Sequence, residues 1–188
     1  MRIIGVDPGL ESTGYAILDD SGRVQTPVQG GVLKTRPSDA LEIRLFSIYT
    51  DLKSVLLEFK PQQMAIEDLH SRYLHVRTGI LMGHARGVLC MAAAEAGIPV
   101  SHHAPTRIKN IVTGSGRADK KQVQLAIAAR LGPGAQTKNE HVADAFAIAL
   151  CHVMMNSGAA ATVAALTYGD PAAARGLTHT SIEVARPT

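Results

Sequence analysis

The sequence contains no tryptophan and few other aromatic residues, three Phe and four Tyr among 188 residues. Proteins that stack bases on aromatic side chains need more of them, so a broad base-stacking surface is excluded. Cysteine is equally scarce. Cys90 and Cys151 both lie in apolar, helix-type stretches, and we expect buried free thiols in a reducing compartment rather than a disulfide framework.

Long apolar runs are also missing. No window holds the roughly 18 uninterrupted apolar residues of a membrane span, and the N-terminus reaches Asp7 before a signal-type stretch can form. We therefore expect a cytoplasmic protein that does not enter the membrane. With 46% apolar and 19% charged residues the chain can bury a core, and its net charge of +3 favours a polyanionic partner.

The length fits one domain with an extension. From Ser157 onward the composition narrows to mostly Ala, Thr, Gly, Ser and Pro with little periodicity. Such a segment has too few large apolar side chains to form a core. We expect one folded domain over residues 1–156 and a disordered tail over 157–188; a weak Ala-rich helix in the tail is the alternative.

Apolar spacing predicts the order of strands and helices. Strands are expected at 2–7, 14–18, 31–33, 64–66 and 100–103, and helices at 41–59, 73–96, 120–131 and 141–155. The Asp39–Glu42 spacing predicts a capping box for the first helix. Three successive strands followed by strand–helix units are typical of an α/β fold, a mixed five-stranded sheet with helices on both faces.

Two apolar strands close on a carboxylate, at Asp7 and at Glu67. If these strands are parallel neighbours, both acids point into the crevice at the carboxyl edge of the sheet. Two close carboxylates need a cation or a shared proton. Taken singly, each acid is explained as well by an ordinary strand end.

Further along, His141 and Asp144 are three residues apart and share one face of a helix. Burying an aspartate in apolar helical surroundings is costly unless it is paired or binds a metal. His141 has the alternative of a helix-end role. Carboxylates with one histidine suit divalent cations that activate water and neutralise a phosphodiester leaving group.

Positive charge gathers between the fifth strand and the next helix, around the flexible Thr113–Gly116 segment. The five cations there are Arg107, Lys109, Arg117, Lys120 and Lys121, set against Asp119 alone. Each could be ordinary solvated charge, but the clustering favours a phosphate-binding strip. We expect this strip to contact the backbone of a nucleic acid.

Gly79, Gly83 and Gly87 recur every four residues in the second expected helix. Each costs about 0.8 to 1.0 kcal/mol relative to alanine in a helix interior, so close packing must offset them. The partner of this flat face is either the sheet of the same protomer or a second copy of the chain.

Four phrases, GVDPGLESTGYAIL, AIED, GHARGVL and HVADAFAIAL, occur in an order and spacing that closely resembles the RuvC family of crossover junction endodeoxyribonucleases. The resemblance covers residues 1 to about 155. It implies a ribonuclease-H-like fold, a homodimer, and magnesium-dependent symmetrical nicking of four-way DNA junctions during recombination and repair.

Carried over by residue, the resemblance makes Asp7, Glu67, His141 and Asp144 the catalytic metal ligands, with two Mg²⁺ or Mn²⁺ ions per site. Lys109 and Lys120 match DNA-contacting positions. The glycine helix matches the dimer-forming helix, which favours a second copy as its partner. The branch-migration proteins RuvA and RuvB are implied partners.

The sequence departs from the family pattern in two places. Many members carry aspartate where this chain has His141. Three residues after the glutamate, where many members insert a phenylalanine at the junction centre, the chain has His70. Either His70 or Tyr73 is expected to contact DNA there.

Two other functions compete with this interpretation. A sugar-kinase or actin-like phosphotransferase shares the strand and Asp-x-Gly phrase, but it needs a second domain for which this chain has no room. A non-catalytic junction-binding protein would have little reason to keep buried acids in one cleft.

Overall fold

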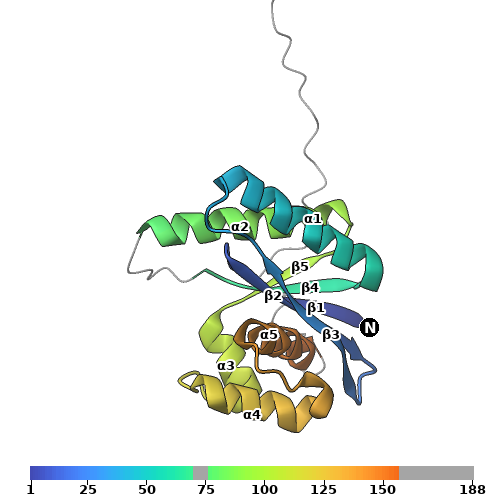
Figure 1. The fold of residues 1–188 in the computed structure, drawn as a ribbon. Coiled ribbons are helices and arrows are strands. Elements are labelled where there is room, and N and C mark those ends of the chain that lie inside the picture. Colours follow the sequence, from blue (N-terminus) through green and yellow to red (C-terminus); the bar gives the residue numbers. More distant parts are fainter. Residues whose placement is uncertain (70–75, 157–188) are drawn as a thin grey trace, which may run out of the picture.

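The computed structural model describes residues 1–69 and 76–156, which form a sheet between two helical layers (Figure 1). The strands are β1 (Arg2–Asp7), β2 (Ser12–Asp20), β3 (Gln25–Lys34), β4 (Gln63–Glu67) and β5 (Val100–His103). The helices are α1 (Leu41–Phe59), α2 (Val76–Glu95), α3 (Pro105–Thr113), α4 (Lys120–Leu131) and α5 (Glu140–Asn156), with a short 3₁₀ turn, η1, at Pro133–Ala135. No helix among these residues is long and apolar enough to cross a membrane.

The sheet has the order β3-β2-β1-β4-β5. β1 pairs antiparallel with β2 and β2 with β3, whereas β1 and β4, and β4 and β5, run parallel. The predicted mixed five-stranded sheet is therefore confirmed. The parallel pairing of β1 with β4 is the relationship on which the closeness of the two strand-end acids depends.

Strand alternation divides the core between the two faces of the sheet. On β1, Ile4 and Val6 pack toward α1 and α2, whereas Ile3 packs toward α5. β4 repeats the pattern, with Ile66 on the first face and Ala65 on the second. Side chains alternate in a strand, so the next residues on β1 and β4 must face α5.

Helix α5 is the most deeply buried helix of the described residues. Its residues 145–153 are all buried. The reason is that α5 lies against the sheet on one side and is covered by α3 and α4 on the other (Figure 1).

Two local expectations were wrong. Helix α1 begins after Ala40 and has no side-chain cap, so the Asp39–Glu42 spacing does not form a capping box. The segment after β5, for which the sequence predicted no helix, contains α3, which starts at Pro105 and ends where Gly114 takes a positive φ of 80°. Its apolar spacing is carried by few residues, chiefly Ile108 and Val112, so the periodicity was too short to recognise.

Glycines allow α5 to lie directly on the strands. A Cβ at Gly5 would collide with the backbone of Ala145 and Ala149, and one at Gly14 would collide with the backbone carbonyl of His141. Only glycine permits this close approach, because the backbone atoms of α5 cannot move aside for a Cβ as the end of a flexible side chain could. The N-terminal turn of α5 is thus held against β2.

Candidate active site

Asp7 and Glu67 lie side by side at the carboxyl edge of the sheet. Val6 pairs with Ile66 in the parallel register, and the two acids are the residues that follow. Each lies at a position that faces α5, as alternation requires. The sheet therefore brings together two acids that are 60 positions apart in the chain.

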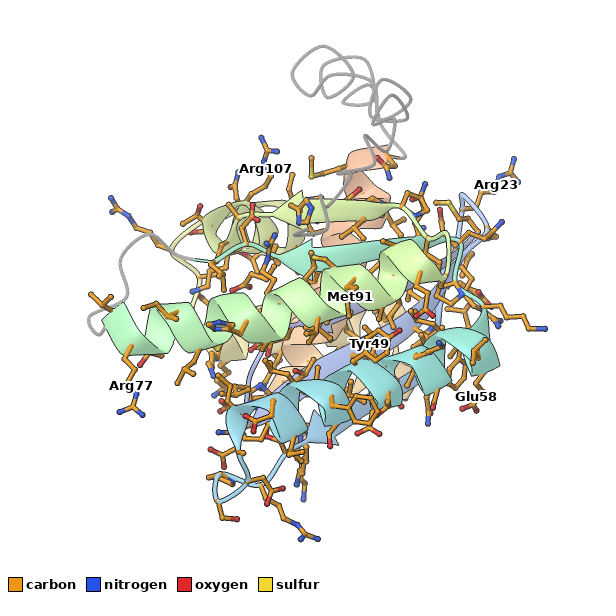
Figure 2. The ribbon with its side chains drawn as sticks, turned by 90° about the horizontal axis from the view of Figure 1, so that it is seen from above. Arg23, Tyr49, Glu58, Arg77, Met91 and Arg107 are labelled. Atoms are coloured by element: carbon orange, nitrogen blue, oxygen red, sulfur yellow. The ribbon has the colours of Figure 1, made fainter. Side chains whose placement is uncertain are left out.

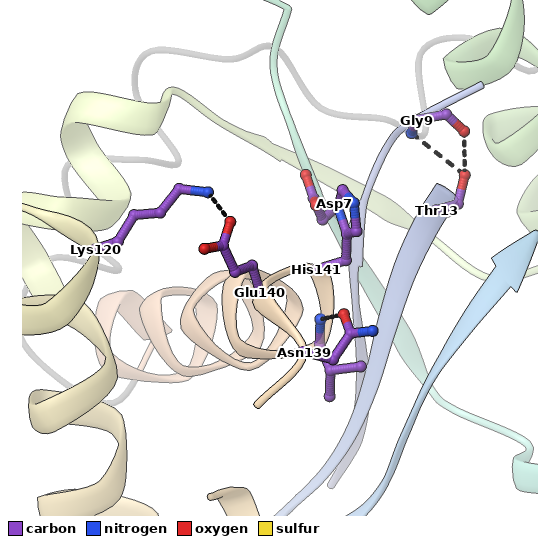
Figure 3. Close-up of polar contacts among 8 residues, drawn as sticks. Asp7, Gly9, Thr13, Lys120, Asn139, Glu140 and His141 are labelled. Atoms are coloured by element: carbon purple, nitrogen blue, oxygen red, sulfur yellow. Dashed lines mark hydrogen bonds and ion pairs between the residues drawn. The ribbon is translucent and has the colours of Figure 1, made fainter. Parts of the chain in front are cut away.

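Helix α5 adds Asp144 and His141 to this edge. The His141 imidazole Nδ1 is 2.9 Å from Oδ2 of Asp7, and the Asp7 side chain is 17% exposed against 46% for the histidine (Figure 3). Asp144 lies one turn further into the helix and is half-buried. The contact at Gly14 sets the position of this turn.

The three acids line one cleft of about 240 Å³, where α3, α4 and α5 meet the ends of β1 and β4. Two lysines, Lys109 of α3 and Lys120 of α4, stand at the same cleft. Its lining is Asp7, Glu67, Pro105, Ile108, Lys109, Lys120, Val123, Asp144 and Ala147. Negative charge inside the cleft is therefore bordered by positive charge.

Burial and mutual repulsion disfavour the ionised acids. Burial, followed by the charges of Asp7 and Asp144, raises the pKa of Glu67 to about 8. Burial also raises the pKa of Asp7, although its hydrogen bond to His141 opposes that effect. The pKa of Asp144 is raised by burial and held back by Lys120. Such a site favours either protons or bound cations.

Within residues 1–69 and 76–156, no three His, Cys, Asp or Glu side chains form a ready-made metal site. The donor chemistry nevertheless fits Mg²⁺ or Mn²⁺, because three half-buried carboxylates share the cleft with only two lysines. Lys109 and Lys120 lower the energy of the ionised acids only in part, since the pKa values of Glu67 and Asp144 remain raised.

The remaining predicted cations are spread over more than one surface. Lys120 forms an exposed ion pair with Glu140 (Figure 3). Lys121 lines a separate hollow between α4 and α5, and Arg107 and Arg117 are exposed on and after α3. Of the five cations, Lys109 and Lys120 line the acidic cleft.

Gly83 and Gly87 of α2 do not pack against the sheet. A Cβ at Gly87 would meet nothing within 4 Å, and one at Gly83 would meet only a Leu69 methyl at 3.8 Å. Gly79 is half-buried near the start of the helix. In Figure 2, which looks onto α1 and α2, Met91 lies on the outer surface of α2, and its side chain is 54% exposed.

His70 and Tyr73, the two candidates for the junction centre, lie outside the described residues, as does the segment 157–188. Thr13, in contrast, was missed. Its buried hydroxyl donates to the Gly9 carbonyl at 2.6 Å and accepts from the Gly9 N–H at 3.3 Å, closing the turn that follows Asp7 (Figure 3). The signal available was a threonine four residues after a glycine in a Pro-Gly turn.

The family model described as crossover junction endodeoxyribonuclease RuvC matches residues 3–152. The chain belongs to the RuvC family. A curated RuvC endonuclease from Rhodopirellula baltica is 47% identical over 156 residues, covering 82% of this chain and 88% of the relative. RuvC of Halorhodospira halophila is 42% identical over 151 residues, 80% of this chain and 89% of the relative.

Among solved structures, Thermus thermophilus RuvC in complex with Holliday junction substrate matches with a TM-score of 0.78 and 31% identity, over 84% of this chain and 95% of that one. The fold is therefore the ribonuclease-H-like fold of RuvC, and the chain is a nuclease of the hydrolase class. RuvC membership rejects the kinase-type alternative.

Proposed function

We propose that this protein resolves four-way DNA junctions by hydrolysing one phosphodiester bond in each of two opposing strands. One observation carries the proposal: three half-buried acids from two strands and a helix share a cleft with two lysines. The bound substrate of the Thermus thermophilus relative supports the choice of DNA. Asp7, Glu67 and Asp144 are the proposed metal ligands, with His141 as the fourth.

Mg²⁺ or Mn²⁺ ions, two per site, would activate the attacking water and stabilise the leaving oxygen. The acids of the cleft explain why such cations would be required. Glu67 has a pKa near 8 in their absence, and ionising it beside Asp7 and Asp144 requires compensating positive charge. The Asp7 carboxylate, which lines the cleft, orients the His141 imidazole.

Lys109 and Lys120 are the proposed phosphate contacts. Both line the cleft, so a backbone phosphate drawn to them would lie beside the acids. Arg107, Arg117 and Lys121 are exposed and are proposed to contact DNA further from the scissile bond. Binding then depends chiefly on cations outside the acid cluster.

We infer that α2 mediates a homodimer. Its outer face exposes Val76 (78%) and Ile80 (55%) as well as Met91, and a hollow of about 390 Å³ beside it includes Gly83 and Gly87. Large exposed apolar side chains beside bare helix backbone fit a close symmetric contact. Two nicks on opposing strands require two sites held at a fixed separation.

The decisive experiment incubates the purified protein with a labelled mobile four-way junction and Mg²⁺ or Mn²⁺, and reads nicks on all four strands. We expect paired nicks on opposing strands only. Asp7→Asn and Glu67→Gln should abolish nicking while gel shifts in EDTA show junction affinity largely intact. Asp51→Asn, the same change at an exposed position of α1, is the matched control.

Parallel loss of binding and cleavage in the acid variants would show that the acids serve the fold. Efficient nicking by either variant would remove that acid from the proposed metal site. Cleavage of linear duplex at the same rate as the junction would overturn the proposed substrate.

A further inference from the structure

Arg86 of α2 reaches the end of β4 from the face of the sheet opposite to the acidic cleft. Its Nε donates to the backbone carbonyl of Glu67 at 3.1 Å, and its Nη2 donates to Oδ1 of Asp68 at 2.8 Å. Its side chain is only 21% exposed. The GHARGVL and AIED phrases thus meet in space, although no role for Arg86 or Asp68 followed from the sequence.

His102 of β5 completes this arrangement. Its Nδ1 lies 2.6 Å from Nη2 of Arg86. Because a guanidinium has no acceptor, the imidazole must present a lone pair at Nδ1. Burial, together with the Arg86 charge, lowers the pKa of His102, which agrees with a neutral ring. The guanidinium therefore has an anchor on β5 as well as on β4.

The peptide unit between Glu67 and Asp68 is held on both sides. Its N–H donates to the His103 carbonyl of β5 at 2.9 Å, and its carbonyl accepts from Arg86. β4 ends at this unit. Without Arg86, only one side of the peptide would be fixed at the point where the chain leaves the sheet.

We propose that Arg86 is a positioning residue, which fixes the Glu67 backbone so that the Glu67 carboxylate is directed into the cleft beside Asp7. It does not touch the acid's carboxylate; it acts through the carbonyl of the same residue. Partners that orient metal ligands typically contribute about 10- to 100-fold to metal affinity. This inference rests on the proposed role of Glu67 as a metal ligand.

The test compares Arg86→Ala with Arg77→Ala, which removes the same charge from an exposed position of the same helix (Figure 2). Mn²⁺ binding to the DNA-free protein is measured by electron paramagnetic resonance, and single-turnover nicking is measured over a Mn²⁺ titration at saturating junction. For Arg86→Ala we expect at least a tenfold rise in the Mn²⁺ dissociation constant and in the half-saturating concentration. Junction affinity in EDTA should change less than threefold.

Arg86→Lys and Asp68→Asn test the geometry. Lysine keeps the charge but lacks the planar fork that serves the carbonyl and the carboxylate together, so it should restore part of the lost Mn²⁺ affinity. Asp68→Asn removes the charged anchor and should weaken Mn²⁺ binding less than Arg86→Ala. These variants also keep the proposal testable if Arg86→Ala does not fold.

Unchanged Mn²⁺ affinity in both Arg86 variants, with Glu67→Gln abolishing it, would overturn this inference and leave the proposed function intact. Unchanged affinity in Glu67→Gln itself would instead reject Glu67 as a ligand. An equal loss in Arg77→Ala would show that charge alone matters, and would also overturn the positioning role.

Discussion

The imidazole Nδ1 of His141 contacts Oδ2 of Asp7 at 2.9 Å across 134 positions of sequence. When the carboxylate is ionised it can only accept, so Nδ1 carries the proton and a neutral ring presents its lone pair at Nε2. Asp7 thus selects the tautomer of the histidine beside it. A histidine oriented in this way is a more basic ligand or proton acceptor than an unsupported one.

His141 is expected to tune which metal the enzyme prefers. An imidazole is a neutral nitrogen donor, whereas the aspartate of many relatives supplies charge and a hard oxygen that suit Mg²⁺. We expect the native enzyme to work better with Mn²⁺ than with Mg²⁺ at low metal, and His141→Asp to shift the preference toward Mg²⁺. Metal titrations of nicking rate for the native protein, His141→Asp and His141→Ala measure this; equal preference in all three would remove His141 from the site.

The raised pKa of Glu67 predicts how the stability of the metal-free protein depends on pH. With a folded pKa of about 8 and an ordinary value of 4.5, the folded state binds more protons than the unfolded chain between these values. The contribution of Glu67 to the free energy of unfolding therefore falls as pH rises, by about 1 kcal/mol from pH 7 to 8, and levels off above pH 8.

The buried His103 and His152 act in the opposite direction, because burial lowers their pKa values, but only at pH below about 6.5. Denaturant unfolding in EDTA at pH 7, 7.5 and 8 isolates the carboxylate, because the raised pKa values of Cys90 and Cys151 lower the free energy of unfolding only at higher pH. Glu67→Gln should flatten the profile and stabilise the protein at pH 8, whereas Glu58→Gln, exposed on α1, should not. Saturating Mn²⁺ should also remove the fall; a profile unaffected by Glu67→Gln would refute the assignment.

The dimer prediction concerns Gly83. Leucine there should be tolerated inside the protomer, since the nearest atom to a new Cβ is 3.8 Å away. It should instead hold a second helix off the surface, giving monomers by sedimentation and single, uncoupled nicks. Ala129→Leu introduces the same side chain at an exposed position of α4 and should leave dimers intact. Unchanged dimers in Gly83→Leu would exclude this face as the interface.

Lys120 is partly neutralised by Glu140 before DNA arrives. The pair is about 60% exposed on both sides, so it contributes little to stability and can break easily. Lys120→Ala should weaken junction binding and lower the salt slope by about one unit. Glu140→Gln should tighten binding several-fold, while Glu42→Gln, exposed on α1, should have no effect. Fluorescence anisotropy over a salt series distinguishes these outcomes. Weaker binding by Glu140→Gln would contradict the prediction that Lys120 leaves Glu140 to contact DNA.

The sequence predicted the candidate site more completely than the helical layer around it. Apolar runs closing on Asp7 and Glu67 predicted their shared edge, because strand ends are marked by short-range pattern. Helix α3 was missed because it is only nine residues long and just two buried apolar residues, Ile108 and Val112, carry its period. The contact of Arg86 with Glu67 could not be foreseen, since it joins a helix to a strand end through a backbone atom that has no sequence signal.

Gly14 sets the distance between the two acids on the sheet and the acid on α5. Two acids are fixed to the sheet and the third is carried by α5, so the gap between them is set by how closely that helix lies on β2. A single methyl group at this position would act as a spacer between helix and strand. The width of the cleft, and with it the size of the cation that the proposed metal site would hold, is thus governed by a residue that has no side chain.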